Sequence, residues 1–159
     1  MALLLLASFH AHSEEKTSRC FELRTYHAAE GKLDALHSRF VDHTIDLLQK
    51  HGMEQIAYWT PLENEGQRLV FLLAYPDRAA REAAWKAFLA DPAWQAAKAE
   101  SEKDGPLVTK VESLFLHPTG YSPEMDLAGE GHVFELRRYT TLPGKLPAID
   151  ARFRDHTIG

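Results

Sequence analysis

The sequence has 159 residues, of which 45% are hydrophobic and 26% are charged, so a disordered chain or a collagen-like fibre is excluded. The net charge of -5 argues against a nucleic-acid partner, because phosphate-backbone binding requires a basic surface. The single cysteine, Cys20, can form neither an internal disulfide nor a zinc cluster. On length alone, the sequence predicts one globular domain. We expect no cofactor, because the sequence contains no Gly-rich phosphate loop.

Residues 1–19 form an apolar leader. The run from Ala2 to Phe9 is shorter than the roughly 20 residues that span a bilayer, but it suits the hydrophobic part of a signal peptide. Small residues at Ala11 and Ser13 offer a cleavage site, although no basic residue precedes the run. We therefore expect export to the periplasm or the medium. The alternative is an apolar leader without a targeting role on a cytoplasmic or mitochondrial protein. No other stretch approaches the length of a membrane span.

Residues 20–52 are predicted to form a strand followed by a helix. Residues 20–26 alternate in the manner of a strand. After Gly31, apolar positions recur every three or four residues and predict a helix that ends at Gly52. The predicted buried stripe of this helix consists of Leu33, Leu36, Phe40, His43 and Leu47.

The second half adds three strands and two helices. Strands are predicted over 55–60, 68–75 and 108–116, and Asp77 and Asp91 are predicted to cap two helices between the last two strands. The order βαββαβ indicates an α+β, ferredoxin-like domain with a four-stranded antiparallel sheet and helices on one face. We expect the other face to carry Tyr26 and Trp59 or Tyr58, and to need a partner because it is apolar.

An internal repeat changes the predicted number of domains. Residues 20–46 and 133–159 are identical at 15 of 27 aligned positions, including Phe-Glu-Leu-Arg and Asp-His-Thr-Ile in each copy. Residues 118–132 are rich in proline and glycine and are predicted to be a linker. The sequence therefore predicts a complete unit over 20–117 and the start of a second, truncated repeat over 133–159. We expect that second copy to form a strand and a helix.

A set of short motifs occurs in order along the first unit: Glu22-Leu23-Arg24-Thr25-Tyr26, Gly31-Lys32, Phe40 with His43, Lys50-His51-Gly52-Met53, Trp59, Ala74-Tyr75, Arg81-Glu82-Ala83-Ala84-Trp85, Phe88 and Asp91-Pro92-Ala93-Trp94. This set of motifs resembles the NIPSNAP family. The resemblance implies a dimeric α/β-barrel fold, in which two ferredoxin-like units pack sheet to sheet, and tandem units are common. Animal members are linked to mitochondria and vesicle traffic. The resemblance implies no catalytic motif. Glu30 departs from the family, in which proline is common at that position.

Five residues are candidates for a ligand pocket. His43 is the candidate general base or donor, because histidine titrates near neutral pH, and its alternative role is a buried structural side chain. Arg24 and Tyr26 share one face of a strand, where Arg24 can pair with a ligand carboxylate or with Glu22 or Glu112. Trp59 and Tyr75 can line an aromatic pocket or pack between sheets.

Two functions follow from these residues. The first is a binding and assembly domain that associates with itself, or with a tandem unit, through the sheet face. The alternative is a cofactor-independent monooxygenase or isomerase that acts on a small-molecule ligand between two sheets. The alternative depends on fold-level analogy. We expect no metal site, because His43 and His51 are eight residues apart on the predicted helix.

Overall fold

The computed structural model describes residues 19–123 and 133–158. The predicted leader lies outside the described residues except for its last position, Arg19, and so do residues 124–132 of the predicted linker. Within the described part of the chain, no helix is long and apolar enough to cross a membrane.

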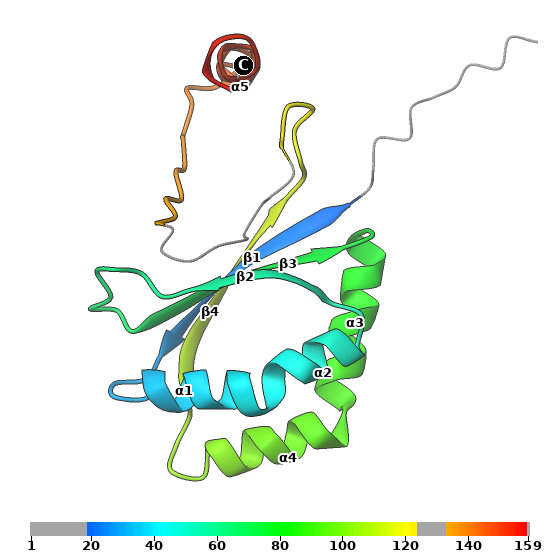
Figure 1. Cartoon of the computed structure of the whole chain (residues 1–159), viewed down its shortest axis with the longest axis vertical. Helices are drawn as coiled ribbons and strands as arrows, with labels where there is room; N and C mark the ends of the chain where they lie inside the picture. Colours follow the sequence, from blue (N-terminus) through cyan, green and yellow to red (C-terminus); the bar gives the residue numbers. More distant parts are fainter. Residues whose placement is uncertain (1–18, 124–132, 159) are drawn as a thin grey trace, which may run out of the picture.

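The first unit has the predicted order of elements. In chain order these are β1 (Cys20–Ala28), α1 (Leu33–Arg39), the π-helical turn η1 (Phe40–Thr44), α2 (Ile45–Lys50), β2 (Glu54–Trp59), β3 (Arg68–Tyr75), α3 (Arg78–Ala90), α4 (Pro92–Ser101) and β4 (Val108–Leu116). The strands form one sheet in the order β2-β3-β1-β4, and each pair is antiparallel. Helices α1, α2, α3 and α4 lie on one side of the sheet (Figure 1). The predicted α+β fold is confirmed.

Aspartates begin both helices of the second half. The Asp77 carboxylate accepts a hydrogen bond from the Ala80 N–H at 2.7 Å, and the Asp91 carboxylate accepts one from the Ala93 N–H at 2.9 Å. Each bond satisfies a backbone donor that the first turn of a helix leaves free. Pro92 follows Asp91 at the first position of α4, where the missing N–H of proline costs nothing. Both predicted caps are confirmed.

The faces of β1 differ from the prediction. Glu22 and Arg24 are buried on the helix side, and Tyr26 packs there against the core. Phe21 and Leu23 alternate with them and point to the side without helices. The expectation that Arg24 and Tyr26 face a cavity between two sheets was therefore wrong. Tyr58 also packs against the helix-side core, whereas Trp59 pairs with Val70 and lies on the bare side as predicted.

The first helix contains a π-turn that moves His43 out of the predicted stripe. The Ile45 N–H donates to the Phe40 carbonyl five residues back, and the Thr44 hydroxyl donates to the Arg39 carbonyl at 3.1 Å. The residues that face the sheet are therefore spaced by four: Leu36, Phe40, Thr44 and Leu48, all at most 4% exposed. His43 is exposed, which corrects its prediction as a buried residue.

The second copy forms its helix but no strand. Helix α5 (Leu146–Arg152) and the π-turn η2 (Phe153–Thr157) repeat the start of the first unit, and the Thr157 hydroxyl donates to the Arg152 carbonyl as Thr44 does to Arg39. Residues 133–142 form no strand, so the predicted strand of the second copy is absent from the structure. Phe134 lies against Trp59 of the first unit, with ring centroids 5.7 Å apart.

Candidate functional site

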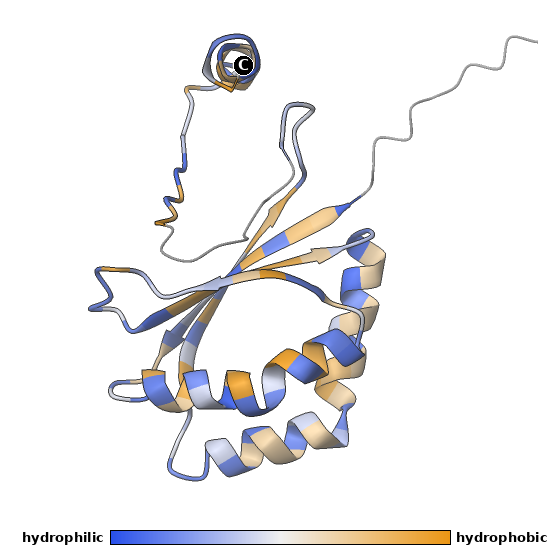
Figure 2. Cartoon of the chain, in the orientation of Figure 1, coloured by the Kyte–Doolittle hydropathy of each residue, from blue (hydrophilic) through white to orange (hydrophobic). Residues whose placement is uncertain are grey.

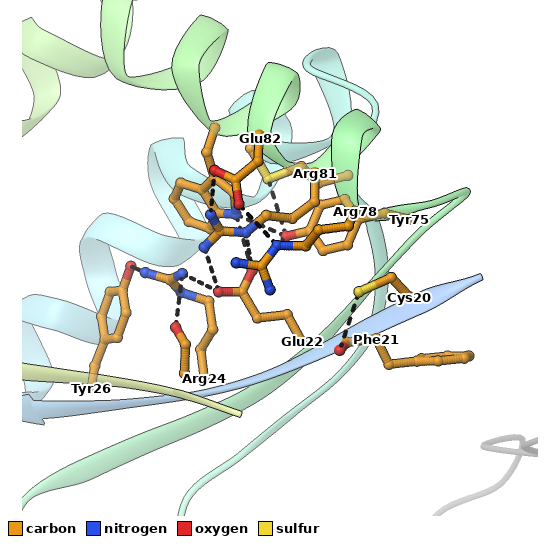
Figure 3. A network of polar contacts seen from close by, with 12 residues as sticks. Cys20, Phe21, Glu22, Arg24, Tyr26, Tyr75, Arg78, Arg81 and Glu82 are labelled. Carbon is orange, nitrogen blue, oxygen red and sulfur yellow. Dashed lines mark hydrogen bonds and ion pairs between the residues drawn. The ribbon is translucent and has the colours of Figure 1, made fainter. Parts of the chain in front are cut away.

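The Glu22 carboxylate is the centre of a buried polar network between β1, β3 and α3 (Figure 3). One carboxylate oxygen accepts hydrogen bonds from Arg24 and Arg81, each at 2.6 Å. The other accepts bonds from Tyr75 and Arg81 at 3.0 Å and from the Trp85 indole at 3.2 Å. The carboxylate thus receives five donors, and no other charged group is so enclosed among the described residues.

The surrounding cations determine the charge of this network. Burial by itself raises the pKa of Glu22, but the hydrogen bonds from Arg81 and the charge of Arg24 outweigh it and lower the pKa from 4.5 to about 2. Burial and the neighbouring Glu22 charge together raise the pKa of Tyr75 far above its ordinary value. At neutral pH the network therefore contains an ionised Glu22 and a neutral Tyr75.

Arg24 ties the network to the edge of the sheet. Its guanidinium also donates to the Ser113 hydroxyl and to the Tyr26 hydroxyl, each at 3.3 Å, and it lies 4.1 Å from the centre of the Trp85 ring. Such stacking of guanidinium on indole is favourable, and more so away from water. Arg24 therefore pairs with Glu22, one of the two carboxylates predicted for it.

A separate pocket of about 240 Å³ lies between the first helix and β2. The π-turn contributes Phe40 and Val41 to its lining, and β2 contributes Tyr58 and Trp59. His37 contributes a polar ring, so the pocket combines aromatic walls with one titratable side chain.

The predicted site residues fall into three places. Arg24, Tyr26 and Tyr75 belong to the Glu22 network, Trp59 lines the pocket at β2, and His43 is exposed on the first helix. Of these five residues, only Trp59 lines the pocket between the first helix and β2.

The sequence indicated Glu22 as a partner of Arg24 but not as the centre of a network, and it indicated neither the contact of Arg81 with Glu22 nor the π-turn. A signal for Glu22 existed, because Glu-x-Arg-x-Tyr places three polar groups on one face of a strand.

The chemistry available to the Glu22 network is limited by its own contacts. Both carboxylate oxygens are occupied by side chains of this chain, which leaves no position for a substrate proton. No group of histidine, cysteine and carboxylate side chains suited to a metal ion occurs among the described residues. The arrangement is that of a network that holds α3 against the sheet.

The order of the elements and of the strands defines an α+β domain of ferredoxin-like type, with one covered and one bare sheet face. The NIPSNAP family model matches residues 21–123, and the chain belongs to this family. The resemblance seen in the motifs is confirmed.

Solved structures of NIPSNAP proteins have a similar fold. An uncharacterized NIPSNAP domain protein from Burkholderia xenovorans is 27% identical, over 66% of this chain and 99% of that one, with a TM-score of 0.58. A NIPSNAP family protein of unknown function from Agrobacterium tumefaciens is 23% identical, over 69% of this chain and 96% of that one, with a TM-score of 0.60. No curated protein matches the sequence.

Proposed function

We propose that this NIPSNAP domain is a binding and assembly domain that pairs with a second such unit through the bare face of its sheet. One observation carries the proposal: β1 buries its polar residues Glu22 and Arg24 under the helices and turns its apolar residues Phe21 and Leu23 to the side that none of the described helices covers. A strand that faced water on this side would carry its polar residues there.

Strand β4 continues this apolar surface with exposed leucines, whereas the facing residues of β3, Leu72 and Ala74, are buried. Phe21 and Leu23 lie opposite Ala74 and Leu72 of β3 on one side, and opposite Leu116 and Leu114 of β4 on the other. Leu114 and Leu116 are 37% and 38% exposed. Hydrophobic and hydrophilic residues alternate along β1 and β4 (Figure 2). A contiguous apolar surface of this kind is typical of an interface, because its burial gains about 25 cal/mol per Å².

The occupant that fits is a second sheet of the same kind, either in another copy of the chain or in a tandem unit. Two such faces are complementary because each offers apolar side chains from β1 and β4, and sheets pack face to face about 10 Å apart.

Light scattering coupled to size exclusion tests the proposal. We expect the chain to be dimeric or larger at tens of micromolar, and Leu114→Lys to shift it to the monomer because a charge cannot be buried unpaired. Leu89→Lys is the matched control, since Leu89 is also exposed (56%) but lies on α3, on the helix side. A wild-type chain that remains monomeric, or a Leu89→Lys variant that dissociates as readily, would refute the proposal.

A further inference from the structure

The pocket between the π-turn and β2 has the size and lining of a site for a small ring. Its volume is about 240 Å³, and an apolar cavity of about 150 Å³ is enough to hold benzene. Two rings of aromatic carbon therefore fit. Phe40, Val41, Ile45 and Tyr58 supply the apolar part of the lining.

One end of the pocket is polar. The His37 Nε2 atom and the Thr60 hydroxyl lie 3.4 Å apart, which is a long and weak hydrogen bond that a ligand group can replace at little cost. The Tyr58 hydroxyl, by contrast, already donates to the Gln55 side chain. The hydrogen-bonding capacity of the pocket therefore lies with His37 and Thr60.

The backbone makes this pocket. The π-turn widens the helix where Phe40 and Val41 face β2, and single π-turns within α-helices are frequent at functional sites. No Asp, Glu, Lys or Arg side chain lines the pocket, so nothing there would compensate an ionised ligand.

We propose that this pocket binds a neutral, planar molecule of one or two aromatic rings with one hydrogen-bonding group directed at His37 and Thr60. This ligand site goes beyond sheet pairing and does not depend on it, because its lining comes from the helix-side residues Phe40 and Tyr58 and the edge of β2.

Indole is the probe, and isoleucine methyl NMR is the readout. The sequence has four isoleucines, of which only Ile45 lines the pocket. We expect titration with indole to shift the Ile45 δ1-methyl signal with saturation. Ile158 occupies the corresponding position of the second copy, after η2, and its signal should stay in place.

Three variants test the site. Val41→Trp fills the mouth at a position that is 71% exposed and should abolish the Ile45 shift, whereas Val111→Trp on the opposite edge strand should leave it unchanged. His37→Leu should weaken indole binding about five-fold, as expected for one lost hydrogen bond. An unshifted Ile45 signal at the solubility limit of indole would overturn the proposal. The proposal would also be overturned if indole still shifted the Ile45 signal in Val41→Trp, or if the affinity for indole were unchanged in His37→Leu.

Discussion

Replacing Glu22 with glutamine tests how far the buried network stabilises the fold. The amide keeps the shape of the carboxylate but removes the charge that compensates Arg24 and Arg81. Removing one partner of a buried ion pair is costly, because the remaining charge stays buried without compensation. We therefore expect Glu22→Gln to fold with a clearly reduced free energy of unfolding at pH 7.

The magnitude follows from the pKa of Glu22. This pKa falls from 4.5 to about 2 on folding, and each pKa unit of the difference corresponds to about 1.4 kcal/mol of folding free energy. Because the Glu22 side chain is fully buried, screening by solvent removes only part of this free energy. We expect the ionised Glu22 to stabilise the folded state by about 2–3 kcal/mol. Because the folded pKa is the lower one, the stabilisation is complete above pH 4.5 and is lost as the pH falls towards 2.

Urea unfolding of wild type and Glu22→Gln between pH 7 and pH 2 measures this effect. The difference between the two proteins should shrink below pH 4.5, where wild-type Glu22 in the unfolded state takes up its proton. Glu82→Gln is the matched control, because Glu82 also contacts Arg81, at 3.2 Å, but is 56% exposed. Its substitution should change stability by about 0.5 kcal/mol or less. A difference for Glu22→Gln that does not vary with pH, or an equal effect of Glu82→Gln, would refute the reasoning.

Three further predictions concern the helices and the cysteine. Thr44→Val should cost about 1 kcal/mol in urea unfolding, because it removes the hydroxyl bond to the Arg39 carbonyl within the π-turn but keeps the shape; an unchanged midpoint would contradict this. Hydrogen bonds from Lys50, His51 and the Ala93 N–H hold the pKa of Asp91 well below its ordinary value. Asp91→Ala should therefore lower the urea midpoint at pH 7, and the difference in midpoint between this variant and the wild type should become smaller in acid. Cys20 is 1% exposed and should react with a thiol reagent only after unfolding; rapid labelling of the native protein would contradict its burial.

The order of elements was predictable because each is signalled locally. Asp77 and Asp91 stand where helices begin, and the alternation of residues 20–26 indicates a strand whatever lies around it. Sheet order then follows from the small number of ways in which βαββαβ packs. The fold therefore required only short-range patterns and a topological rule.

The position of His43 was not predictable from helical spacing. A regular helix places residues 36, 40, 43 and 47 on one face, whereas the π-turn takes one more residue per hydrogen-bonded ring and brings Thr44 and Leu48 to the sheet instead. The four-residue spacing of Leu36, Phe40, Thr44 and Leu48 was visible, but a buried threonine was the less apolar choice. A hydroxyl that bonds the backbone made it acceptable there.

The face of β1 was predicted wrongly for a different reason. Alternation separates Glu22 and Arg24 from Phe21 and Leu23, but it does not say which set meets the helices. Hydrophobicity alone would bury Phe21 and Leu23 there. The actual choice depends on Arg81 and Trp85, which lie about sixty residues away in sequence and complete the network around Glu22.

The second copy shows which features of the Glu22–Arg24 pair come from the local sequence and which come from packing. Glu135 and Arg137 form an ion pair at 2.8 Å, as Glu22 and Arg24 do, yet both side chains are about two-thirds exposed and residues 133–142 form no strand. The pairing of residues two apart is thus a property of the Glu-x-Arg pattern itself. Arg137 lowers the pKa of Glu135 as well, but burial and the strand are present only in the first copy, where partners such as Arg81 enclose the carboxylate. Stability measured at Glu22 is therefore a property of the assembled unit, not of the motif that marks it in the sequence.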